Sequence, residues 1–327
     1  MGSIRPIRLY LLLSGCVVLS LTSWSQTSSL ATIRKLFEAR HFESAKSQLS
    51  IISKDSKEYP EALYLFGRIA VEERSYDLSI QMFERAIAEN PHVAEYHNWL
   101  GVMYGVIAMS SNPIRQAYYA PKIRNQFEEA AGLDPENLQT QWGLINYYTK
   151  APGFLGGSWE KALICAGVIS KQDRIQGLRA LGFIHAEQGK DSVAEKELME
   201  AFDAEPDNWE NTFALAQFYF GKKMFERTVA LYQSYMERHP QNMIVAFHLG
   251  ATSARSGIAM DRGIRCLTHY LSYIPHPNEP AHSDAHMNLG LLYEKKGQRE
   301  LARKCFLASL KIEPGLKEAR EGLSRVN

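Results

Sequence analysis

The stretch LFGRIAVEERSYDLSIQMFERAIAENP (65–91) recurs later in the chain as ALGFIHAEQGKDSVAEKELMEAFDAEP (180–206). The two copies align without a gap, with a glycine near the start and a proline at the end in the same places. A further copy (215–240) follows at a spacing of 34 residues. Repetition at this period indicates an array of small units that stack on one another.

Each copy predicts two antiparallel helices joined by a short turn. Proline ends the second helix because it lacks a backbone N–H and clashes with the preceding turn. Small residues on the first helix are expected to allow a close approach, and small residues on the second helix are expected to receive them. The first set is Gly67, Gly101, Gly182, Gly250 and Gly290, and the second is Ala162, Ala194, Gly263 and Ala302.

Several segments resemble the tetratricopeptide repeat family. They include WLGVMY (99–104) and NLGLLY (288–293), the latter followed by ARKCFLASLKIEP (302–314). The resemblance covers nearly all of the chain after residue 25 and implies an all-α, right-handed superhelical solenoid of about eight helix-turn-helix units. The expected units are 27–59, 60–93, 94–137, 138–174, 175–208, 209–242, 243–281 and 282–315, with a polar closing helix at 316–327.

The resemblance also implies a concave groove lined by the first helix of each unit. Side chains at the fifth and ninth positions of the units are expected to face it, and they are aromatic with scattered polar groups. Packing between neighbouring units is the alternative role for each of them. The expected groove residues are Tyr64, Arg68, Asn98, Trp142, Asn146, Arg179, Phe183, Phe213, Gln217 and Phe247.

Three segments depart from the period, near 105–122, 149–158 and 275–282. Such insertions map to the turns of a solenoid, often on a binding face. We therefore expect a second surface at the long turns, and the candidates around the Gly-rich one are Tyr147, Tyr148, Pro152 and Phe154.

The Gly-rich turn APGFLGGS (151–158) does not have the spacing of a phosphate-binding loop, and no β-branched strand precedes it. Ser158 is instead expected to cap a helix that starts at Trp159. The turn is interpreted as structural.

The first 25 residues have the pattern of a secretory signal. Arg5 and Arg8 precede an apolar run (9–21) that is too short to span a membrane. Ser23 and Ser25 then provide small residues ahead of a possible cleavage site before Gln26. The alternative is a lipoprotein anchor at Cys16. Either case predicts export to the periplasm or the cell exterior, the second as an outer-membrane lipoprotein.

Catalytic and metal signatures are weak. No nucleophile motif appears, and His282 and His286 share a helix face with Asp284 nearby but lack a full ligand set. No metal or other cofactor is therefore expected. Cys165, Cys266 and Cys305 are an odd number of widely spaced residues, which predicts buried free thiols.

Composition is that of an ordinary globular protein, with 45% hydrophobic residues, 22% charged residues and a formal net charge of +1. This balance argues against nucleic acid as a partner. The sequence predicts a non-catalytic scaffold of the cell envelope that binds a segment of another protein. The alternatives are a solute- or glycan-binding accessory protein and a hydrolytic enzyme with an unrecognised site. The oligomeric state stays open.

Overall fold

The computed structural model describes residues 30–276 and 279–327, and the leader predicted at 1–25 lies outside these residues. Within them, all regular structure is helical, which confirms the expected all-α fold. Sixteen helices form consecutive antiparallel pairs. The pairs are α1 (Leu30–Glu38) and α2 (Phe42–Leu49), α3 (Tyr59–Glu72) and α4 (Tyr76–Glu89), α5 (Ala94–Met109) and α6 (Pro113–Leu133), α7 (Leu138–Lys150) and α8 (Trp159–Gln172), α9 (Arg174–Glu187) and α10 (Asp191–Ala204), α11 (Trp209–Gly221) and α12 (Phe225–Arg238), α13 (Met243–Ser256) and α14 (Met260–Tyr270), and α15 (His282–Lys295) and α16 (Arg299–Ile312).

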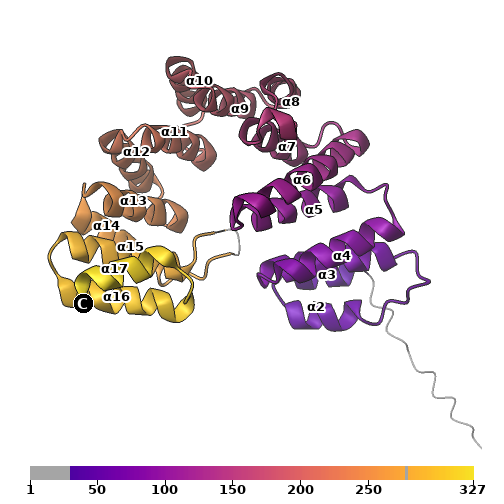
Figure 1. Ribbon diagram of the computed structural model, residues 1–327, viewed down its shortest axis with the longest axis horizontal. Helices are drawn as coiled ribbons and strands as arrows, with labels where there is room; N and C mark the ends of the chain where they lie inside the picture. The colour runs from indigo at the N-terminus through magenta and orange to yellow at the C-terminus, as the bar shows by residue number, and fades with distance from the viewer. Residues whose placement is uncertain (1–29, 277–278) are drawn as a thin grey trace, which may run out of the picture.

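The pairs stack into a curved solenoid that bends back on itself (Figure 1). From α7 to α14, the first helix of each pair lies on the inner side of the curve and the second on the outer side. None of the helices in the described residues is long and apolar enough to cross a membrane.

The glycines of the first helices receive large side chains, which differs from the expected small-to-small packing. A Cβ atom built on Gly67 would lie 2.6 Å from Phe83 Cε1. The same relation joins Gly182 to Leu198, whereas the small Ala194 is fully buried one turn before Leu198. The absence of a side chain on the first helix therefore makes room for a core residue of the second helix.

The last helix, α17 (Lys317–Val326), closes the solenoid. It packs on α15 and α16 and buries Ala319, Gly322 and Val326 against them. Phe306 of α16 fills the space beside Gly322. An amphipathic helix with a polar outer face covers the apolar end of the array in this way.

The loop between α14 and α15 links the two ends of the solenoid. Arg40, in the turn between α1 and α2, contacts Nδ1 of His276, 236 residues further along the chain. The loop is also bonded to the end of α14, because the hydroxyl of Tyr270 donates to Pro280 O at 2.6 Å. The turn of the first pair is thereby in direct contact with the loop that follows the seventh pair.

Candidate functional site

A pocket of about 730 Å³ is lined mainly by residues of α7, α9 and α11. These helices lie on the inner side of the curve in Figure 1. Each of these is the first helix of its pair, and each contributes aromatic side chains to the pocket wall. The lining includes five of the ten predicted groove residues, namely Trp142, Arg179, Phe183, Phe213 and Gln217. The ring centroids of Trp142 and Phe183 are 6.5 Å apart in an edge-on arrangement. The wall is thus an aromatic surface built across three successive units.

Arg179 is one of four charged residues that line this pocket, together with Glu187, Glu210 and Lys222. Its side chain is buried, its guanidinium forms an ion pair with Glu210 of α11, and its Nε atom has no hydrogen-bond partner. Glu210 is itself 65% exposed at its side chain, so water competes with the ion pair. A buried guanidinium with unused donor capacity favours a further acceptor, such as a carboxylate or a backbone carbonyl of a ligand.

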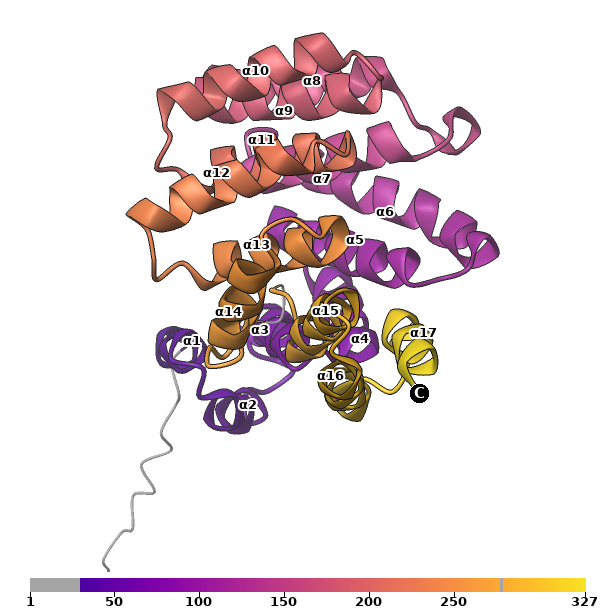
Figure 2. The same ribbon diagram turned by 90° about the vertical axis from the view of Figure 1, so that its left-hand side faces the viewer.

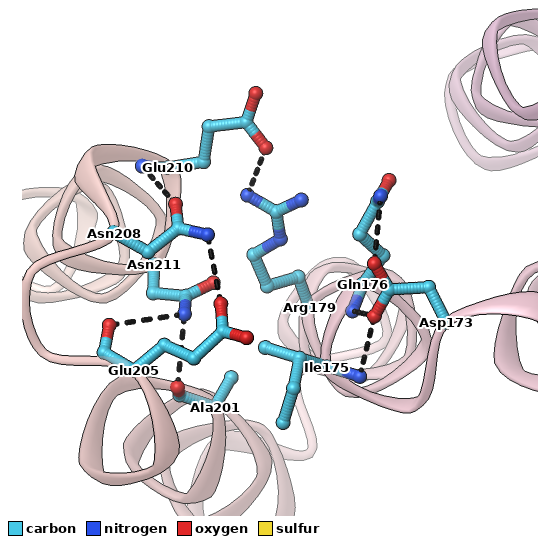
Figure 3. Close-up of polar contacts among 9 residues, drawn as sticks. All are labelled: Asp173, Ile175, Gln176, Arg179, Ala201, Glu205, Asn208, Glu210 and Asn211. Atoms are coloured by element: carbon cyan, nitrogen blue, oxygen red, sulfur yellow. Dashed lines mark hydrogen bonds and ion pairs between the residues drawn. The ribbon is translucent and has the colours of Figure 1, made fainter.

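The helix starts around Arg179 are fixed by side-chain caps (Figure 3). Asp173 accepts hydrogen bonds from the backbone N–H groups of Ile175 and Gln176, both at 2.9 Å. The bond from Gln176 lowers the pKa of the Asp173 carboxyl below its ordinary value. Asn208 accepts from Glu210 N at 2.9 Å and so holds the first turn of α11. These caps fix the first turn of each helix, and the ion pair between Arg179 and Glu210 joins α9 to α11.

The remaining predicted groove residues do not line this pocket. Tyr64 is buried and stacks on Tyr96, and its hydroxyl accepts a 2.7 Å hydrogen bond from Arg68. Asn98 is buried and accepts from Thr140 Oγ1 at 3.2 Å.

Asn146 is exposed on α7, where its amide donates to the backbone of its own helix. Phe247 belongs to the core of the next pair, against Tyr270. Of the ten predicted residues, five line the pocket, Tyr64 and Arg68 form a smaller cluster, Asn98 and Phe247 are buried in the interior, and Asn146 is exposed outside the pocket.

Trp209 is a pocket residue that the fifth and ninth positions omit. It lies one helical turn before Phe213, so the two share a helix face, and their ring centroids are 5.0 Å apart. Extending the groove positions by one turn toward the start of each first helix would have found it. Trp209 also stacks on His248 of α13 at 5.9 Å.

The Gly-rich turn uses its backbone N–H groups internally. Leu155 N and Gly157 N donate to Pro152 O, and Ser158 N donates to Tyr148 O at 3.0 Å. Donors engaged in this way cannot cradle a phosphate. The side chain of Ser158 accepts from Lys161 N at 3.2 Å, which confirms the expected helix cap.

Of the candidate residues around this turn, Pro152 and Phe154 are exposed, and Phe154 sits in the short 3₁₀-helix η1 (Gly153–Leu155). Tyr147 and Tyr148 are buried in a hydrophobic cluster, and their hydroxyls donate to Leu155 O and to the Glu128 carboxylate. A ligand at the turn would therefore meet only Pro152 and Phe154.

In the histidine cluster near α15, His282 and Asp284 are engaged in local structure, whereas the buried Nδ1 of His286 has no hydrogen-bond partner among the described residues. Nε2 of His282 lies 2.7 Å from Tyr273 O, and the Asp284 carboxylate accepts from Ala281 N at 3.0 Å. Across residues 30–276 and 279–327, no three metal-ligating side chains gather in one place.

All three cysteines in the described residues are free, as expected. Burial raises the pKa of Cys165 to about 11 and also raises the pKa values of Cys266 and Cys305. At neutral pH the thiols are protonated, which makes them poor nucleophiles.

The fold and the inner pocket define a helical-repeat solenoid with a concave aromatic surface. Family models described as tetratricopeptide repeat match residues 30–91 and 64–104, and another with the same description matches residues 283–316. These matches, at both ends of the described solenoid, support the tetratricopeptide repeat family. Among curated protein sequences, none gives a significant match.

Solved structures with a similar course of the chain share low sequence identity with it. One is a tetratricopeptide repeat protein from Parabacteroides merdae, at 12% identity and a TM-score of 0.49, covering 82% of this chain and 98% of that one. Another is the APC/C hetero-tetramer Cut9–Hcn1, at 16% identity and 0.48, covering 93% of this chain and 57% of that one. A third is YrrB, described as a TPR protein with an unusual peptide-binding site, at 15% identity and 0.36, covering 74% and 97%.

Proposed function

We propose that this protein is a non-catalytic scaffold that binds a segment of another protein in the pocket between α7, α9 and α11. The observation that carries the proposal is the aromatic wall of this pocket, which is preformed by three successive repeat units. Aromatic side chains supply much of the binding energy at protein interfaces because they bury large areas with few rotatable bonds.

The chemistry of the wall defines the segment it suits. Trp142, Phe183 and Phe213 offer apolar faces, and Gln217 offers an exposed amide at the rim. Arg179 lies beneath and can exchange its exposed partner Glu210 for an acceptor on the ligand. A segment with one or two large apolar side chains next to a carboxylate or a free carbonyl fits this arrangement.

The proposal includes a location in the cell envelope, which rests on the sequence of residues 1–25. The mass of the mature protein from its native host distinguishes cleavage before Gln26 from an acylated Cys16. An envelope protein is the partner expected in either case.

The test is site-specific photocrosslinking in native cell envelopes. A crosslinking residue replaces Gln217 at the pocket rim or, as the control position, Met199, which is exposed on the outer helix α10. We expect one defined partner peptide to be crosslinked from position 217 and not from position 199. Mass spectrometry of the crosslinked peptide identifies the segment that is bound.

A paired variant tests whether the aromatic wall is responsible. Trp142→Ala with Phe213→Ala is expected to weaken capture at least about tenfold, given the energies typical of interface aromatics. The control is Phe202→Ala with Phe220→Ala, which removes two partly buried rings that do not line the pocket. Equal capture by both variants, at equal helix content by circular dichroism, would contradict the assignment of the groove.

A further inference from the structure

The most exposed large hydrophobic side chains in the described residues concentrate in two inserted turns. Met109 and Ile114 flank the turn between α5 and α6, and Phe154 lies in η1 between α7 and α8. Each is at least 85% exposed. The insertions lengthen the unit beyond the period of the repeat, so neither stacking nor core packing requires these apolar residues.

Both turns project from the same edge of the solenoid, on the right in Figure 2. They are connected by α6, because η1 packs against this helix and Arg124 lies beside Gly156. Ile114 and Arg124 are ten residues apart, which is about 15 Å along a helix. The edge therefore presents two separate apolar tips.

The edge around α6 also carries positive charge. The sequence has no Asp or Glu from residue 96 to residue 127, whereas it has Arg115, Lys122 and Arg124. Arg124 pairs with Glu128, but Arg115 and Lys122 have no acidic partner among the ion pairs of the described residues. Lys122 Nζ lies 4.5 Å from the ring centroid of the exposed Tyr118.

We infer that this edge, consisting of the α5–α6 turn, the first half of α6 and η1, is a docking surface for an anionic lipid bilayer. Exposed Met, Ile and Phe side chains insert into the boundary between headgroups and acyl chains, while nearby cations attract anionic headgroups. Tyrosine is enriched at this depth because its ring is apolar and its hydroxyl is polar, which suits Tyr118.

A bilayer fits this surface better than a protein partner does. Stable protein interfaces bury about 800 Å² per partner in a contiguous, well-packed patch. Here the apolar tips are separated from one another, and every residue from 112 to 118 is exposed. A bilayer surface deforms around isolated tips and needs no matching hollow. This surface is distinct from the inner pocket and does not depend on what the pocket binds.

The experiment is vesicle co-sedimentation with the protein expressed from residue 26 onward, which excludes an acyl anchor at Cys16. Vesicles of equimolar phosphatidylglycerol and phosphatidylcholine are compared with vesicles of phosphatidylcholine alone. We expect binding to the anionic vesicles, reduced by added salt, and little binding to the zwitterionic ones.

Two sets of variants separate the contribution of the apolar tips to vesicle binding from that of the positive charges. Met109→Ser, Ile114→Ser and Phe154→Ser together are expected to weaken binding about tenfold or more. The matched control changes three exposed isoleucines outside this edge, with Ile51→Ser, Ile274→Ser and Ile312→Ser. It should bind the vesicles as the unmodified protein does. Arg115→Gln with Lys122→Gln should remove the preference for anionic vesicles.

The inference is overturned if the unmodified protein binds neither vesicle, or if the tip variant and the control variant bind equally. If the tip variant instead loses a protein that the control retains, while neither binds vesicles, the edge is a protein contact and the bilayer is excluded as its ligand.

Discussion

His248 of α13 is held among aromatic rings. Phe213 lies 4.9 Å from it, Trp209 and Tyr232 stack on it, and Phe247 meets it edge-on. With no charged partner, the imidazole loses hydration and gains nothing in return, and burial lowers the pKa of His248 to about 4. The ring is therefore neutral in the folded protein at physiological pH.

This shift predicts a pH dependence of stability. The folded-state pKa of His248 lies below the unfolded value near 6.5, so stability is fully present above that value and is lost as the pH falls toward 4. The loss from this one group is on the order of 3 kcal/mol over that window. Urea unfolding at pH 7.5 and at pH 4.5 measures it, with His248→Phe as the comparison. The variant keeps an aromatic ring and should lose less stability on acidification. An equal loss in both proteins would assign the effect to other groups.

Packing within a helix pair depends on the missing side chain of one glycine. In the α3–α4 pair, a methyl group on Gly67 would lie 2.6 Å from Cε1 of the fully buried Phe83. Gly167, in the middle of α8, has no atom within 4 Å of a built Cβ. Both glycines lie inside helices, but one is tightly packed against a buried ring and the other faces open space.

The two environments predict opposite effects of the same substitution. Gly67→Ala should destabilise the protein by about 1–3 kcal/mol through overpacking. Gly167→Ala should stabilise it by about 0.5–1 kcal/mol because alanine is the better helix former. Urea midpoints of the two variants against the unmodified protein provide the measurement. Stabilisation by Gly67→Ala would show that Phe83 can yield, and that the close approach is not needed.

At the scale of the whole molecule, each helix pair is stabilised by its interfaces with the neighbouring pairs. The α9–α10 pair is packed on both sides, whereas α1 and α2 are short and, within the described part of the chain, pack mainly on α3. In a quasi-one-dimensional array the end units open at lower free energy. Amide hydrogen exchange should therefore be at least about tenfold faster in residues 30–49 than in residues 174–204. Equal protection would indicate that the contact between Arg40 and His276 couples the two ends, and Arg40→Ala should then restore fast exchange in the first pair.

The sequence by itself determined the class of fold. Repeated spacing of small residues, apolar residues and prolines specifies helix pairs, because each feature acts on the local backbone or on the next helix. Ser158 could be identified as a helix cap for the same reason, since a cap acts within one turn. The groove positions follow from the same local register, and five of the ten meet in one pocket.

The tertiary structure decided which of those positions share a surface and which are buried. Tyr64 and Phe247 occupy the same repeat position as Trp142 but are buried, because the packing of adjacent units differs along the curve. The ion pair between Arg179 and Glu210 joins residues of successive units, and the contact between Arg40 and His276 joins residues more than 200 positions apart. A repeat pattern fixes the helices of each unit. The burial of a given side chain depends on how the adjacent units pack on it, and the meeting of distant turns depends on the accumulated curvature of the whole array.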